Sequence, residues 1–204
     1  MKFSIIRSLA TFPIRNIKRL LWSFQFGHFG KKSWIDAPLR IEGKSNIYIG
    51  NRVGVHHKSW LAALPLTGAD SVRLVLEDNT VIGDFNHIFA TQSIHIEKSV
   101  LTANYVYISD NLHDYSDINT PIINQPIIQQ KEVIIGEGSW LGEHVCIIGA
   151  CVGKHCVIGA NSVVTRDIPN YCVAVGAPAH VIKRYNPKSQ QWEKTDKNGN
   201  FLEQ

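Results

Sequence analysis

The sequence predicts an all-β chain whose short strands wind into a parallel β-helix, and three features support this fold class. From about residue 41 the chain is built of six-residue units, each of which begins with Ile, Leu or Val. The fifth residue of a unit is small or β-branched. One long polar interval, between Ile108 and Ile135, interrupts the units without ending them.

The repeat is clearest after this interval. The leading aliphatic residues there are Ile135, Leu141, Ile147, Val152, Ile158 and Val164. The fifth positions are Ser139, Val145, Cys151, Cys156 and Ser162. The unit that begins at Ile147 is one residue short, which predicts a local slip at one corner. Earlier units are looser and begin at Ile41, Ile47, Val53, Leu76, Ile82, Ile88, Ile96, Thr102 and Ile108.

A period of six matches neither the 3.6-residue period of a helix nor the two-residue alternation of a simple strand. It matches short strands separated by corners, with three flat faces and about 18 residues in each coil. We expect the leading aliphatic residues to point inward and stack from coil to coil. The small fifth residues then fit beside the corners. Cys151 and Cys156 occupy that position, so both are predicted to be buried, inert core thiols.

The most specific stretch runs from Ile158 to Pro169 (Ile-Gly-Ala-Asn-Ser-Val-Val-Thr-Arg-Asp-Ile-Pro) and is followed by Val175-Gly-Ala-Pro-Ala179. With the repeats before it, this stretch resembles the galactoside, maltose and polysaccharide O-acetyltransferases of the hexapeptide-repeat acyltransferase superfamily. The resemblance covers residues 41–184. It implies a left-handed parallel β-helix, an exception to the right-handed crossover rule. It also implies a homotrimer that binds acetyl-CoA between adjacent helices and acetylates a sugar hydroxyl, as in capsule or O-antigen biosynthesis.

Three segments are predicted along the chain. Residues 36–184 form the β-helix, with an extruded loop at about 109–134, and residues 185–204 form a polar tail that is either a short helix covering the last coil or a loose end. Residues 1–35 form a basic amphipathic segment that has no acidic residue before residue 36. We expect residues 1–32 to pack on the protein body, or alternatively to contact anionic lipid.

Regular coils commit their side chains to the core or to a flat surface, so chemistry is expected where the repeat breaks. Residues 109–134 begin with a polar, turn-rich stretch, which predicts a loop that leaves the helix. Long loops in compact proteins are usually functional. His113 ends the unit that begins at Ile108, immediately before this loop. The catalytic histidine of the resembled family occupies this position, which implies that His113 is the general base.

A neutral imidazole with an ordinary pKa of about 6.5 can remove the proton of a sugar hydroxyl as that hydroxyl attacks a thioester. Asp110 and Asp114 are candidates to orient the imidazole or contact the acceptor, although acids are also ordinary loop residues. The resembled galactoside enzymes have an acceptor-binding Asn where this chain has Gly83. Asn86 and His87 are candidates to replace it, while Asn86 is alternatively a corner residue.

The family pattern implies six positions that bind acetyl-CoA, namely Trp140, Ala160, Thr165, Arg166, Lys183 and Arg184. The small side chain of Ala160 permits close approach of the pantetheine arm. The cations can pair with the phosphates, although each is alternatively a solvated surface charge. Trp140 is alternatively a residue of the trimer interface. No metal cofactor is expected.

Composition limits the remaining classes. The 204 residues, with a net charge of +4, suffice for one substantial domain. No apolar run approaches the roughly 20 residues that span a bilayer. The four cysteines suggest neither a disulfide framework nor a metal knuckle, which favours a reduced, cytoplasmic setting. Nucleic-acid binding is not expected, because basic residues do not cluster beyond the N-terminus and no reader motif is present.

Three alternative functions stay open at this point. In the first alternative, the acceptor is an amine of an amino sugar, or a hydroxyl of an antibiotic, instead of a sugar hydroxyl. In the second alternative, the chain is a non-catalytic β-helix that serves as an interaction protein. A metalloenzyme of the γ-class carbonic anhydrase type requires three histidines that converge across a subunit interface, for which His87, His113 and His144 are candidates, although their spacing does not match that class.

Overall fold

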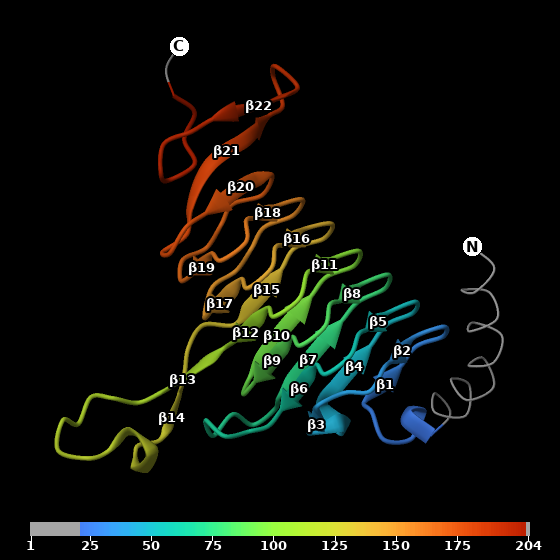
Figure 1. The fold of residues 1–204 in the computed structure, drawn as a ribbon. Coiled ribbons are helices and arrows are strands. Elements are labelled where there is room, and N and C mark those ends of the chain that lie inside the picture. The colour runs from blue at the N-terminus through green and yellow to red at the C-terminus, as the bar shows by residue number, and fades with distance from the viewer. Residues whose placement is uncertain (1–20, 203–204) are drawn as a thin grey trace.

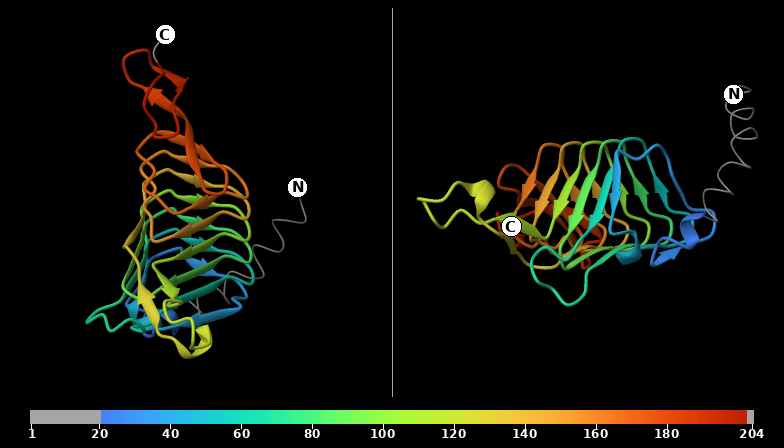
Figure 2. Two further views of the ribbon diagram at one scale, coloured as in Figure 1. Left: turned by 90° about the vertical axis from the view of Figure 1, so that its left-hand side faces the viewer. Right: turned by 90° about the horizontal axis from the view of Figure 1, so that it is seen from below.

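The computed structural model describes residues 21–202 and shows a three-sided parallel β-helix (Figures 1 and 2). Successive strands pass to each of three sheets in turn, so that each sheet collects about every third strand. The six-residue unit explains this rotation, because a unit is one short strand plus one corner. The predicted fold class is confirmed, and no helix among the described residues is long and apolar enough to cross a membrane.

Two sheets consist of parallel pairs throughout. The five-stranded sheet runs in the order β1 (His28–Phe29), β4 (Ile47–Ile49), β7 (Arg73–Leu76), β10 (Ser93–Ile96) and β15 (Val133–Ile135). The six-stranded sheet runs in the order β3 (Arg40–Glu42), β6 (Trp60–Ala63), β9 (His87–Ala90), β12 (Tyr107–Ser109), β17 (Cys146–Ile148) and β19 (Val163–Val164).

The third sheet has nine strands and changes direction at its end. Its order is β2 (Trp34–Ile35), β5 (Gly54–Val55), β8 (Val81–Ile82), β11 (Leu101–Thr102), β16 (Trp140–Leu141), β18 (Val157–Ile158), β20 (Cys172–Val175), β21 (His180–Asn186) and β22 (Gln191–Lys194). The last two pairs, β20–β21 and β21–β22, are antiparallel. The coiling therefore ends after β20, at the turn formed by Gly176–Ala179.

The core is a set of aliphatic stacks along the helix axis. In the six-stranded sheet, for example, Ile88, Ile108, Ile147 and Val164 lie in register on successive strands, and each is 0% exposed. Each such side chain contributes about 1.5–3 kcal/mol through burial. The predicted inward stacking of leading aliphatic residues is confirmed, with Ile41 in the first coil only partly buried.

The prediction of a buried core thiol is confirmed for Cys156 and wrong for Cys151. Cys156 is 1% exposed, but Cys151 is only partly buried. The short unit after Ile147 is the reason. There Gly149 adopts a left-handed backbone conformation with φ +54°, and Ala150 takes the inward small-residue position at 0% exposed.

The predicted boundary at residue 36 is too late. Strands β1 and β2 already pair with β4 and β5 of the next coil, and Phe29 and Ile35 are 7% and 4% exposed. Trp22 and Phe26 pack on this first coil, with Phe26 and Phe29 ring centroids 5.3 Å apart. The apolar residues of 21–35 are therefore part of the β-helix core, while residues 1–20 of the predicted basic segment lie outside the described residues.

The predicted tail is neither a helix nor a loose end. Strand β21 crosses the predicted boundary at residue 184 and β22 pairs with it, so the tail extends the nine-stranded sheet beyond the last coil (Figure 1). Val181 of β21 is 3% exposed and belongs to the core. This hairpin covers the end of the apolar stack in place of a helical cap.

Two segments project from the same edge of the β-helix (Figures 1 and 2). One is the hairpin of β13 (Asn111–His113) and β14 (Ile127–Gln129), which contains the 3-10 turn η2 (Ile122–Asn124). The other is the connection 64–72 between β6 and β7. A second 3-10 turn, η1 (Lys44–Asn46), precedes β4 in the first full coil. The extruded loop was predicted, whereas the 64–72 segment was not.

Candidate active site

His113 lies where the chain leaves the β-helix. Strand β12 ends at Ser109, and β13 then pairs antiparallel with β14, with His113 opposite Ile127. The His113 side chain is exposed. Its position at the departure of the extruded loop is as the repeat predicted.

The base of this hairpin is fixed by the buried carboxylate of Asp110, which is 0% exposed. Its Oδ2 accepts hydrogen bonds from the backbone N–H groups of Gln92 and Ser93, both 2.8 Å. Its Oδ1 accepts from the backbone N–H of Thr91 at 2.8 Å and from the side-chain amide of Asn111 at 3.1 Å. Asp110 is therefore a structural residue, and its predicted contact with the acceptor or the imidazole is wrong.

Gln129 joins the hairpin to its surroundings. Its side-chain Nε2 donates to the backbone carbonyl of Asp110 at 2.7 Å. Its Oε1 accepts from Oγ1 of Thr67 at 2.7 Å and lies 2.9 Å from Oγ1 of Thr91. The side-chain amide of Gln129 therefore joins the hairpin, the 64–72 segment and the neighbouring coil. Gln129 lies opposite Asn111 at one end of the β13–β14 strand pair.

Asp114 is engaged within the hairpin loop. Its Oδ1 accepts from the backbone N–H of Ser116 at 2.9 Å, and this bond lowers the pKa of the Asp114 carboxyl below its ordinary value. Its backbone N–H donates to the carbonyl of Pro126 at 2.8 Å. This Asx-type turn holds the chain that follows His113. A contact between Asp114 and the acceptor stays a prediction.

The predicted role of Asn86 in acceptor binding is wrong, because its amide is buried at 1% exposed. Its Nδ2 donates to Oγ1 of Thr102 at 2.7 Å, and its Oδ1 accepts from the backbone N–H of Val106. Asn86 is thus the corner residue that the alternative described. The adjacent Gly83 cannot be Asn in this coil, since a Cβ there would lie 2.4 Å from the carbonyl oxygen of Ala103.

His87 points outward from the six-stranded sheet but is half covered by aromatic rings. Its ring stacks on that of Trp60 with centroids 4.1 Å apart and planes at 8°, and the Tyr107 ring lies 5.2 Å away. Burial lowers the pKa of His87, opposed by the charge of Glu42. Its Nε2 is buried without a hydrogen-bond partner within residues 21–202, which agrees with the lowered pKa.

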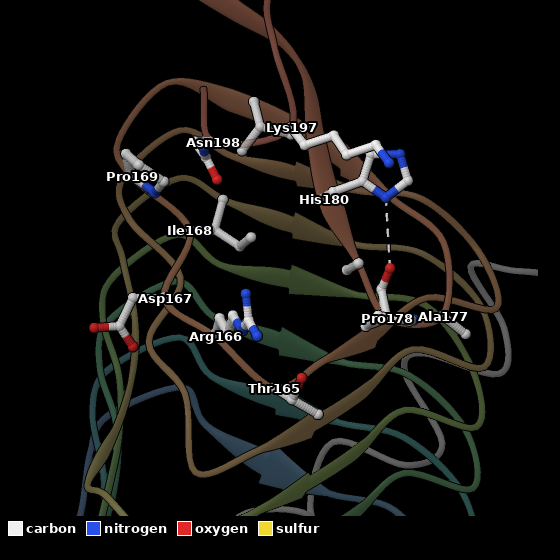
Figure 3. Close-up of a pocket in the computed structure, with 12 residues that line it drawn as sticks. Thr165, Arg166, Asp167, Ile168, Pro169, Ala177, Pro178, His180, Lys197 and Asn198 are labelled. Atoms are coloured by element: carbon white, nitrogen blue, oxygen red, sulfur yellow. Dashed lines mark hydrogen bonds between the residues drawn. The ribbon is translucent and has the colours of Figure 1, made fainter. Parts of the chain in front are cut away.

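A pocket of about 680 Å³ lies between the last coil and the tail (Figure 3). Thr165 and Arg166 line its coil side, as two of the predicted cofactor residues. His180 of β21 and Lys197 of the tail line the opposite side. The pocket is thus formed by segments that are separate in the sequence, and it presents three basic side chains.

The other predicted cofactor positions do not line this pocket. Trp140 of β16 is 46% exposed, and Ala160 is exposed at the corner after β18. Neither Lys183 nor Arg184 lines the pocket. They stand on β21 opposite Val173 and Cys172. Thr165 and Arg166, which are neighbours in the sequence, thus share this pocket. All six positions stay predictions as cofactor contacts.

Sequence similarity relates the chain to known acetyltransferases, although no family model matches it. The putative lipopolysaccharide biosynthesis O-acetyl transferase WbbJ of Escherichia coli (strain K12) is 35% identical over 128 residues, which are 59% of this chain and 65% of WbbJ. The chain thus spans less than two thirds of that relative. Galactoside O-acetyltransferase of the same organism is 29% identical over 168 residues, 82% of this chain and 68% of the relative.

Solved structures agree on the fold. AntD, an N-acyltransferase from Bacillus cereus, in a variant complexed with dTDP-4-amino-4,6-dideoxyglucose and coenzyme A, matches with a TM-score of 0.69 at 19% identity. The match covers 84% of this chain and 91% of that one. This likeness shows that the chain has a left-handed parallel β-helix fold, as the repeat and the C-terminal motif implied.

The three histidines of the metalloenzyme alternative are not grouped in one chain. Within residues 21–202 of one chain, no three His, Cys, Asp or Glu side chains are grouped to hold a metal ion. His87, His113 and His144 therefore do not form a metal site within a single chain. His87 stacks among aromatic rings, and His144 stacks on Tyr105 with centroids 4.8 Å apart.

Sequence reasoning missed three residues that shape the site. Thr67 was overlooked because the 64–72 segment was not recognised as a projection, although Leu64-Pro-Leu-Thr-Gly68 carries a turn signal. Gln129 was overlooked because its hydrogen bonds join residues far apart in the chain. Lys197 was overlooked because it lies in a polar tail that was expected to be peripheral, and no local signal identifies it.

Proposed function

We propose that this chain is an acetyl-CoA-dependent O-acetyltransferase that acetylates a sugar hydroxyl with His113 as the general base. The observation that supports it most is an exposed histidine on a hairpin that leaves the β-helix of an acyltransferase fold. WbbJ and galactoside O-acetyltransferase, which are named for O-acetyl transfer, support the hydroxyl as acceptor. A role in surface polysaccharide biosynthesis agrees with the name of WbbJ.

The reaction needs one base and no acyl-enzyme. The imidazole of His113 takes the hydroxyl proton while the hydroxyl oxygen forms a bond to the thioester carbonyl carbon. The tetrahedral intermediate then collapses, the carbon–sulfur bond breaks, and the imidazolium returns its proton to the CoA thiolate. General-base catalysis of this kind is worth about 10²–10⁴-fold in rate, and the remainder comes from holding both substrates in place.

Binding of acetyl-CoA is proposed along the C-terminal coils. Arg166 and Thr165 in the pocket would contact the nucleotide end, and Trp140 and Ala160 would flank the pantetheine arm. The AntD neighbour is complexed with coenzyme A, which supports this cofactor. The proposed assembly is a homotrimer, because the exposed His113 and Trp140 leave an open surface that a second copy would close.

Peripheral contact with an anionic membrane also stays a proposal. Residues 1–20 lie outside the described part of the chain, but Leu21 and Phe24 next to them are 56% and 82% exposed. Flotation with anionic vesicles tests it. The full chain should float, a chain without residues 1–20 should not, and failure of both to float would refute the contact.

The proposed function is tested by thiol release from acetyl-CoA against a panel of sugars and polysaccharide fragments. Acceptor-dependent release should fall at least about 10²-fold in His113→Ala, with the exposed His155→Ala as control. Release that is unchanged in His113→Ala would contradict the assignment of the base. Preference for amino sugars, as in the N-acyltransferase AntD, would replace O-acetylation by N-acetylation. The absence of any turnover would favour a non-catalytic β-helix.

A further inference from the structure

The tail forms a tight loop after β22 whose shape its own side chains fix. Thr195 and Phe201 pair as an antiparallel bridge. Between them, Oδ1 of Asp196 accepts from the backbone N–H groups of Asn198 and Asn200, both 2.9 Å, and Oδ2 accepts from the Asn200 side chain at 3.0 Å. These bonds lower the pKa of the Asp196 carboxyl. The loop is therefore a defined structure.

This loop is seated against the end of the β-helix. Gly199 is buried and lies next to the side chain of Val181, where a Cβ on the glycine would be 3.6 Å from the valine methyl groups. The backbone N–H of Thr195 donates to the carbonyl of Ile182 at 3.3 Å. As a result, Lys197 and Asn198 face the pocket and form the wall opposite Thr165 and Arg166 (Figure 3).

The charges in the pocket favour an anion. Its basic residues are Arg166, His180 and Lys197, and its one carboxylate is Asp167. That carboxylate pairs with Lys131 and also accepts from a backbone N–H at 2.9 Å, so its charge is compensated outside the pocket. Neither Arg166 nor Lys197 makes an ion pair with any residue from 21 to 202. An arginine and a lysine that face the same space without counter-ions are suited to a phosphate.

We propose that Lys197 of the tail joins Arg166 in binding the 3′-phosphate of CoA, so that the tail loop selects the phosphorylated form of the cofactor. This inference rests on the proposed function. A phosphomonoester carries close to two negative charges at pH 7, so two cations on opposite walls match it. The family motif points to Lys183 and Arg184 as phosphate contacts, whereas the pocket assigns this role to a residue beyond the coils.

The test compares two thioesters that differ only in that phosphate. Lys197→Ala should raise the KM for acetyl-CoA about 2–5-fold, the range expected for one exposed charge pair. It should leave the KM for acetyl-dephospho-CoA unchanged. Lys188→Ala removes a lysine from the β21–β22 turn, which does not line the pocket, and is the matched control. The proposal would be overturned if Lys197→Ala raised the KM for both thioesters equally or changed neither KM.

A binding measurement separates this proposal from the proposed function. By calorimetry, adenosine 3′,5′-bisphosphate should bind the unaltered chain more tightly than adenosine 5′-phosphate does. Lys197→Ala should abolish most of that difference, and Arg166→Ala should do the same. If no acceptor supports turnover, the proposed function fails, while this difference in affinity still decides whether the pocket recognises the 3′-phosphate. Equal affinity for both nucleotides would refute it.

Discussion

The hydroxyl of Thr67 donates a 2.7 Å hydrogen bond to the side-chain oxygen of Gln129, although 62 positions separate the two residues. Gln129 also donates to the backbone carbonyl of Asp110 at 2.7 Å. The two projections of the β-helix are therefore tied together at the base of the strand pair that carries His113. Each projection lacks the stacked neighbours that hold a regular coil, so its order depends on this polar junction.

Thr67→Val should loosen the 64–72 segment without disturbing the coils. The substitution keeps the shape of the side chain but removes one hydrogen bond, which is worth about 1 kcal/mol. Hydrogen exchange followed by mass spectrometry should show faster exchange in 64–72 and at β14, with unchanged protection in β7 and β10. Thr120→Val, in the loop of the β13–β14 hairpin, is the control. Protection of 64–72 that is equal in both variants would contradict this role of Thr67.

Asp110→Ala should be strongly destabilising. It would leave the backbone N–H groups of Thr91, which is buried, and of Gln92 and Ser93 without their acceptor, which costs roughly 3 kcal/mol in the free energy of unfolding. Denaturant titration measures this loss. The neighbouring Asp114→Ala is the matched control and should leave the transition midpoint nearly unchanged, because Asp114 bonds only within an exposed loop. Similar midpoints for the two variants would show that Asp110 is not the anchor of the hairpin.

His87 should make the stability of the protein depend on pH. Burial lowers the pKa of its imidazole in the folded chain, so the unfolded chain binds more protons. The stability contributed by neutral His87 is therefore complete above the unfolded pKa of about 6.5 and is lost as pH falls through the folded pKa. His87→Phe keeps the stacking with Trp60 and removes the titration.

The difference in unfolding free energy between His87→Phe and the unaltered chain should therefore grow in favour of the variant as pH falls from about 7.5 to 5. Denaturant titrations at each pH measure it, and the subtraction removes the contribution of the other histidines. A difference that stays constant over this range would show that the His87 pKa is not lowered in the folded state.

The cysteines should differ in reactivity. Burial raises the pKa of the Cys156 thiol to about 11 and raises that of Cys172 as well, whereas Cys151 is only partly buried. Because the thiolate is the reactive form, iodoacetamide at pH 8 should label Cys151 in the native protein and spare Cys156. Peptide mass spectrometry before and after unfolding measures this. Labelling of Cys156 at the rate of Cys151 would contradict the burial of that thiol.

The sequence by itself determined the β-helix and the position of His113. The inward positions repeat at a fixed interval, so the spacing alone assigns Ile108, Ile147 and Val164 to the core. The interruption of the repeat after Ile108 likewise located the hairpin and His113 at its start. A single sequence contains this information because every coil buries an aliphatic residue at the same position of its six-residue unit.

Only the tertiary structure decided which polar residues are structural and which face open space. Asp110 and Asn86 looked like acceptor contacts in the sequence, but neighbouring coils bury both and satisfy them with hydrogen bonds. Lys197 looked peripheral, but a tail loop that packs on Val181 places it on the wall of the pocket opposite Arg166. The physical reason is that hydrogen bonds and pockets depend on distances between residues far apart in the chain, and these distances are set by how coils stack and how the tail folds back.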